Sequence, residues 1–178
     1  LRYAHARAES LGKAQTVDGR PAHVGQTPLV AVGATDQHSL LQLFAEGPFD
    51  KVVVMVRAED HGREIPIPSA YGDLESLAYL GGAGLGELLN LEQLATEVAL
   101  GKAGRPVMTI NVPQVNAFTV GQLFHFFEAA VAFAGGLYEV DPFDQPGVEE
   151  SKRLTYAQMG RAGFEVRRAE VEAWVARK

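Results

Sequence analysis

The sequence predicts a single α/β domain in which helices flank a mostly parallel sheet. Short apolar runs rich in β-branched residues alternate along the chain with longer segments of helical periodicity. At least one run carries no polar alternation, which is typical of a parallel strand covered on both faces. The 178 residues suffice for one domain with its own core, and we expect that domain to span residues 1–178, with a helical extension from about residue 142.

Three runs have the length and composition of strands. They occupy residues 27–33, 51–58 and 105–113. The second reads Lys-Val-Val-Val-Met-Val-Arg-Ala, and a loop rich in proline, glycine and charge follows it at 59–72. We expect the three strands to be parallel, with ligands binding beyond their carboxyl ends.

The remaining segments have helical periodicity, and most of them end at glycine. They occupy residues 1–12, 35–47, 86–104, 119–138, a segment that starts at 146, and 165–178. The second has Thr35 or Asp36 as its predicted N-cap. The fourth is very apolar but contains His125 and Glu128, so we expect it in a buried layer rather than in a membrane. The glycines of 81–86 lack dinucleotide-loop spacing and predict a turn before a helix.

Composition and charge exclude several classes of protein. Lys and Arg total 16 against 22 Asp and Glu, giving a net charge of −6 with no basic run, so nucleic acid is not an expected partner. The chain has no cysteine, which excludes disulfides, thiolate catalysis and cysteine-bound zinc and suits a cytoplasmic protein. His125 and Glu128 alone do not make a metal site, and we expect neither metal nor cofactor.

Four polar residues stand at positions where chemistry is plausible, and each has an ordinary structural alternative. Gln37 and His38 follow the first predicted strand, where a helix N-terminus favours a neutral imidazole, although a solvent-facing role fits as well. Glu9 lies in the last turn of its helix, which suits a general base, although glutamates there are common. Lys152 lies beside the apolar stripe of its helix rather than opposite it, and its alternative is a surface pair with Glu149.

Three segments together resemble the glucose-6-phosphate isomerase family. The sequence from Phe143 to Lys152, Phe-Asp-Gln-Pro-Gly-Val-Glu-Glu-Ser-Lys, is similar to the C-terminal signature of that family. Glu9-Ser10-Leu11-Gly12-Lys13 resembles its Glu-Ser-x-Gly-Lys segment, and Gln37-His38 resembles its Gln-His at a helix start. The resemblance covers nearly the whole chain and implies the family's second sugar-isomerase (SIS) domain, a three-layer α/β/α, flavodoxin-like fold.

The resemblance also implies roles for these residues. Glu9 is the expected base between C1 and C2 of an open-chain sugar phosphate, and His38 and Lys152 are expected to open the sugar ring. Gln145 and Gln37 are expected to bind substrate. The resemblance further implies a homodimer in which His38 is lent to the neighbouring subunit.

The family's N-terminal SIS domain has no counterpart in this sequence, nor have its Ser/Thr-rich phosphate cradle and its Gly-Gly-Arg segment. We therefore expect an incomplete site and weak activity from the chain alone. Two alternatives remain, namely a regulatory module that senses sugar phosphates without catalysis and a purely structural dimerisation domain. The joint presence of Glu9 and Lys152 favours the enzyme, because a sensor needs neither a base nor a ring-opening acid.

Overall fold

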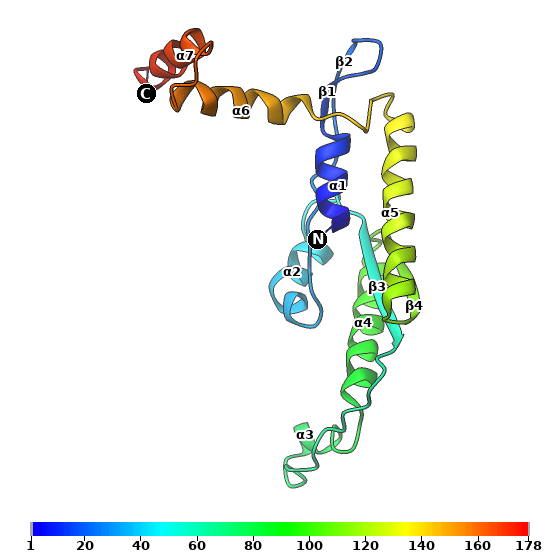
Figure 1. Ribbon diagram of the computed structural model, residues 1–178. Helices are drawn as coiled ribbons and strands as arrows, with labels where there is room; N and C mark the ends of the chain where they lie inside the picture. Colours follow the sequence, from blue (N-terminus) through cyan, green and yellow to red (C-terminus); the bar gives the residue numbers. More distant parts are fainter. Residues whose placement is uncertain (1, 178) are drawn as a thin grey trace. The chain divides into compact units, whose positions relative to one another are not determined.

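The computed structural model describes residues 2–177, which form helices, a hairpin and a parallel pair of strands (Figure 1). The elements are α1 (Arg2–Leu11), β1 (Lys13–Gln15), β2 (Pro21–Val24), α2 (Thr35–Glu46), β3 (Val53–Asp60), α3 (Glu75–Ala78), α4 (Leu85–Lys102), β4 (Val107–Gln114), α5 (Ala117–Leu137), α6 (Pro146–Gln158) and α7 (Glu165–Val175). They divide into two compact units, the first made of residues 1–29 and 124–178 and the second of residues 30–123.

The second unit is built on the parallel pair of β3 and β4. Val53 pairs with Val107, and the register continues without a break as far as Ala58 and Val112. Alternate side chains therefore share a face. On one face Gln93 of α4 donates hydrogen bonds to Met55 Sδ (2.9 Å) and Thr109 Oγ1 (3.3 Å), so α4 covers this face of the sheet. The predicted combination of helices with a parallel sheet is confirmed.

The other face of the sheet is open to solvent within the described chain. Val54, Val56 and Met108 are 39%, 50% and 53% exposed. Strands this apolar are normally covered on both faces. The second unit by itself therefore leaves uncovered one of the two faces that its sequence predicts to be covered.

The predicted strand at residues 27–33 is wrong, because these residues form no strand in the structure. The Val32 N–H donates to the Asp36 carboxylate (2.7 Å), so it serves the start of α2 and not a sheet ladder. Leu29 and Val32 are exposed. An apolar run becomes a strand only where another strand offers its backbone groups, and the described residues offer none here. The helix after it is confirmed, but Ala34 takes the N-cap position instead of Thr35 or Asp36.

Two side chains connect α2 to the rest of the second unit through hydrogen bonds. Gln37 donates through Nε2 to the Glu92 carbonyl (3.2 Å) and to Thr96 Oγ1 (2.7 Å), both on α4. Arg105 donates to the carbonyls of Ala45 (2.9 Å) and Gly47 (2.7 Å) at the other end of α2. A cation there also suits the negative end of the helix dipole.

The first unit begins with α1, which leads into an antiparallel hairpin that the sequence reading missed. Strands β1 and β2 pair across a turn whose Gly19 has φ +82°, a conformation that glycine adopts without steric cost. The Asp18-Gly19 dipeptide is a recognised turn signal and was sufficient to predict it. Arg20 of this hairpin forms an ion pair with Glu139, and the Val17 N–H donates to the Glu139 carbonyl (2.8 Å).

The C-terminal helices α6 and α7 pack against each other in the same unit (Figure 1). The rings of Tyr156 and Phe164 meet edge to face with centroids 5.7 Å apart, and Arg161 lies over both rings. Both helices lie within the segment expected to form a helical extension from about residue 142.

Helix α5 is long and apolar enough to cross a membrane by length and composition only. Only 6% of its most apolar window is buried, with Phe126 and Phe133 among the exposed side chains. Core helices of water-soluble proteins meet the same criterion. The finding therefore establishes an uncovered apolar surface and nothing more.

The buried core is smaller than the apolar composition predicts. Among residues 2–177, the apolar side chains buried from solvent are Leu11, Leu100, Val112, Val131, Val140 and Ala157. A domain of this length normally buries about two thirds of the surface that its unfolded chain exposes. The described units therefore leave much of their apolar surface for contacts outside themselves.

We expect the carboxylate of Glu97 to make the stability of the second unit depend on pH. Its carboxylate accepts from Thr109 Oγ1 (2.7 Å) and from Gln93 Nε2 (3.0 Å), and these bonds, that of Thr109 first, lower the pKa of Glu97 below its ordinary value of 4.5. A lowered carboxyl pKa contributes stability that is present above the ordinary value and is lost as the pH falls through the folded value. Thermal unfolding between about pH 6 and pH 3 should show less acid destabilisation in Glu97→Gln than in wild type. Glu87→Gln, an exposed site on the same helix, is the control. Parallel pH curves for wild type and Glu97→Gln would contradict the assignment.

Candidate active site

Glu9 lies on the last turn of α1, as the sequence predicts. The helix ends at Leu11, which is fully buried, and Glu9 itself is exposed. Its Oε2 lies 2.8 Å from His5 Nε2, one helical turn earlier. The spacing of four residues places the two side chains on one helical face. The imidazole fixes the orientation of the Glu9 carboxylate while leaving it open to solvent.

Directly after α1, Lys13 is a buried cation. Its side chain is 4% exposed, and its Nζ donates to the carbonyls of Ser10 (2.7 Å) and Asp144 (2.7 Å) and, at 3.3 Å, of Glu9. The Asp144 carboxylate lies 3.4 Å from the same nitrogen. The end of the Glu9 helix is thereby joined to the segment that leads into α6.

Helix α6 begins at Pro146, as predicted, and Gln145 is at its N-cap position. Proline suits this position because its missing N–H has no helical partner there. The Gln145 side chain makes no capping hydrogen bond to the helix. It is exposed at the same helix start as the Lys13 contact to Asp144.

Lys152 lies one turn and a half into α6 and pairs with Glu149. Its Nζ donates to Glu149 Oε1 (2.7 Å), and both side chains are about half exposed. This hydrogen bond and then the charge of Glu149 raise the pKa of Lys152, with smaller contributions in the same direction from Tyr156 and Glu9. The surface pair set aside in the sequence reading is therefore present. A lysine amine is protonated at neutral pH, so Lys152 suits a hydrogen-bond donor rather than a base.

The first unit thus contains three of the five predicted site residues, Glu9, Gln145 and Lys152. They lie on α1 and at the start of α6, two segments that are joined through Lys13.

Gln37 and His38 belong to the second unit, in the first turn of α2. The amide nitrogen of Gln37 is occupied by its two bonds to α4, so this side chain has a structural role that the sequence did not indicate. His38 is exposed. The predicted strand that was to place both residues at a sheet edge does not form, so their location rests on α2 alone.

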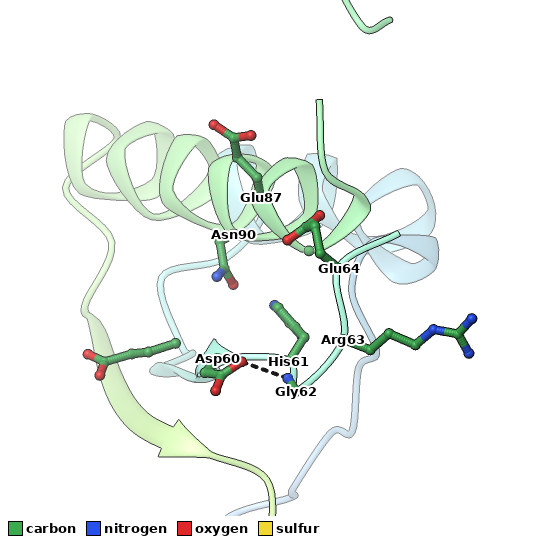
Figure 2. A pocket seen from close by; sticks show the side chains of 9 residues that line it. Asp60, His61, Gly62, Arg63, Glu64, Glu87 and Asn90 are labelled. Atoms are coloured by element: carbon green, nitrogen blue, oxygen red, sulfur yellow. Dashed lines mark hydrogen bonds between the residues drawn. The ribbon is translucent and has the colours of Figure 1, made fainter. Parts of the chain in front are cut away.

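The second unit also contains a polar cavity of about 410 Å³ that no predicted site residue lines (Figure 2). Its walls are the end of β3, the loop after it and the start of α4. Asp60, His61, Glu64, Glu87 and Asn90 are grouped around it, while the Arg63 side chain extends away from them (Figure 2). Its acidic character is unfavourable for a phosphate ester.

A second cavity, of about 320 Å³, lies between α2, β3 and α4 and is lined mostly by apolar side chains. Gln37 is among its lining residues. The turn predicted from the glycines of 81–86 is confirmed, because α4 starts at Leu85 with Gly84 as its N-cap. Among residues 2–177, no group of three or more His, Asp or Glu side chains is arranged to hold a metal ion.

Comparison with known proteins places the chain in a family. The sequence profile of phosphoglucose isomerase matches residues 3–162. The chain belongs to the phosphoglucose isomerase family. It is 48% identical over 169 residues to the glucose-6-phosphate isomerase of Carboxydothermus hydrogenoformans, covering 95% of this chain and 36% of that enzyme. It is 53% identical over 157 residues to the enzyme of Rubrobacter xylanophilus, covering 88% and 34%.

Solved structures support the same relationship. A hypothetical protein from Thermus thermophilus is 40% identical with a TM-score of 0.82, over 89% of this chain and 37% of that protein. A glucose-6-phosphate isomerase from Chlamydia trachomatis is 22% identical with a TM-score of 0.74, over 99% of this chain and 35% of that enzyme, which shows a shared fold. The family member described here therefore spans about a third of the length of the relatives it matches.

Proposed function

We propose that this chain forms the C-terminal SIS domain of a glucose-6-phosphate isomerase, which interconverts glucose 6-phosphate and fructose 6-phosphate in glycolysis and gluconeogenesis. The observation that carries the proposal is the joining of the Glu9 helix to the start of α6, with Gln145 and Lys152 on it, in a chain that belongs to this family. Relatives about half identical to the chain have this name.

Glu9 is proposed as the base of the isomerisation. Its carboxylate removes the proton from C2 of the open-chain aldose while the C1 carbonyl oxygen gains a proton, which gives a cis-enediol. The same proton then returns to C1 as the C2 hydroxyl loses its own proton, which gives the ketose. The aldose and the ketose are isomers, so the reaction needs no external oxidant or reductant.

His38 and Lys152 are proposed to open the sugar ring. Ring opening removes the proton from O1 and supplies one to the ring oxygen O5. Lys152, whose amine is protonated at neutral pH, is assigned the proton donation toward O5. His38 is assigned the removal of the O1 proton. Gln145 is assigned to the phosphate, and Gln37, whose amide nitrogen is held by α4, to substrate through its oxygen.

The complete site requires protein beyond this chain. Relatives are about three times as long, and the open face of the β3–β4 sheet offers a surface for the remaining part. We propose that this part supplies the phosphate cradle and an arginine that stabilises the enediolate. We further propose a cytoplasmic homodimer in which each subunit contributes its His38 to the active site of its neighbour.

One observation favours a regulatory SIS module without catalysis. Lys152 forms an ordinary surface pair with Glu149, an arrangement that binding or solubility alone explains. The two functions differ in turnover, since a sensor binds the sugar phosphate and leaves it unchanged.

The test compares the complete enzyme, meaning this chain joined to the remaining two thirds found in its relatives, with the chain alone. The complete enzyme should isomerise glucose 6-phosphate in a coupled assay of fructose 6-phosphate formation. The chain alone should have little or no activity, because substrate positioning by remote binding groups can lower the activation barrier by up to about 7 to 11 kcal/mol. Adding the separately expressed remainder should restore activity. Full activity from the chain alone would overturn the shared site, and binding without turnover by the complete enzyme would favour the sensor.

A further inference from the structure

Lys13 makes contacts that the proposed chemistry does not use. Among residues 2–177, Lys13 is the only charged residue that is buried, and 6% of its surface is exposed. An ammonium group has three hydrogens to donate, and the carbonyls of Glu9, Ser10 and Asp144 accept all three. The Asp144 carboxylate adds charge compensation at 3.4 Å. Such full pairing is what allows a charge to remain buried.

The carbonyl groups that accept hydrogen bonds from this ammonium group lie in both segments of the proposed site, the end of α1 and the start of α6. Two of them are the last-turn carbonyls of α1, one belonging to Glu9 itself. The third, 131 residues away from Lys13 along the chain, belongs to the residue directly before Gln145. One nitrogen atom therefore fixes the backbone of the proposed base relative to the start of the helix that holds Lys152.

We propose that Lys13 is a positioning residue for the isomerisation, which sets the Glu9 carboxylate against the substrate groups held from α6. The inference rests on the proposed function of Glu9 and Lys152. A carboxylate that serves two adjacent carbons must be placed closely, and misplacement by about 1 Å can cost roughly 100-fold in rate. Substrate affinity depends mainly on the phosphate contacts and should change little.

The chain offers a matched control in Arg20. This cation lies on the same hairpin and joins it to the same α5–α6 connection through Glu139, but both partners are about 60% exposed. Exposed ion pairs contribute little to stability, and this one touches neither α1 nor the start of α6. Arg20→Met should therefore leave turnover within about twofold of wild type.

The experiment measures kcat and KM for glucose 6-phosphate in the complete enzyme carrying Lys13→Met, Lys13→Arg or Arg20→Met, with circular dichroism and thermal unfolding on each. Lys13→Arg keeps the positive charge and is included in case Lys13→Met does not fold. Its planar guanidinium cannot donate three hydrogen bonds from one nitrogen. Each folded Lys13 variant should lose about 10- to 100-fold in kcat with KM within about threefold of wild type.

Several results would overturn the inference. A folded Lys13 variant with kcat within about twofold of wild type, or a loss confined to KM, removes the positioning role. Failure of both Lys13 variants to fold assigns the residue to stability alone. A wild-type enzyme that does not isomerise the substrate refutes the proposed function as well, whereas active wild type with active Lys13 variants refutes only this inference.

Discussion

Glu9→Gln in the complete enzyme is expected to lower kcat for glucose 6-phosphate by about 10²- to 10⁴-fold, the usual contribution of a general base. The amide is close in size to the carboxylate but cannot accept the C2 proton. KM should stay within about threefold of wild type, because Glu9 is assigned to proton transfer rather than to binding. Steady-state assays of both directions, with the folded state checked by circular dichroism, give the measurement.

Glu172→Gln is the matched control for this prediction. Glu172 is an exposed residue of α7 that pairs with Arg168, and the same chemical change there should leave kcat unaltered. A Glu9→Gln enzyme that keeps more than about a tenth of wild-type turnover would remove Glu9 from the role of base.

Lys152→Met and His38→Ala should separate ring opening from isomerisation. Each is expected to lower kcat/KM for cyclic glucose 6-phosphate by at least about 100-fold, in the range of acid–base catalysis. The loss should be about tenfold or less for a four-carbon aldose phosphate with its phosphate on O4, which cannot close a comparable ring. Both substrates are assayed with the same enzyme preparations.

Lys102→Met, on the exposed last turn of α4, controls for the removal of a positive charge. It should leave both substrates unaffected. Equal losses on the cyclic and the open-chain substrate in Lys152→Met would show that the lysine acts in binding and not in ring opening.

Local sequence signals predicted the elements that depend on local interactions. The helices with strong periodicity form, α6 begins at Pro146, and the β-branched runs around Val53 and Val107 form the parallel pair. The run at 27–33 failed because strand formation depends on a pairing partner that periodicity does not reveal. The hairpin at β1 and β2 was missed although Asp18-Gly19 signals its turn.

In the candidate site, too, local motifs predicted some features, while contacts between distant residues were not predicted. Motif resemblance selected Glu9, Gln145 and Lys152, which the structure places in one unit. It did not reveal the burial of Lys13, because a contact between residues 131 positions apart leaves no trace in local pattern. It also gave Gln37 a substrate role without its bonds to α4, which join residues more than 50 positions apart in the sequence.

The central claim is that the Glu9 carboxylate carries one proton between two adjacent carbons of the sugar. Its most direct test is isomerisation of glucose 6-phosphate deuterated at C2 by the complete enzyme, followed by mass spectrometry of the fructose 6-phosphate. The account predicts that wild type delivers part of the deuterium to C1 and exchanges the rest with water, and that Glu9→Gln loses transfer and exchange together, by the same factor as kcat. Deuterium transfer that persists at the wild-type rate in Glu9→Gln would contradict the account, because another group would then be moving the proton.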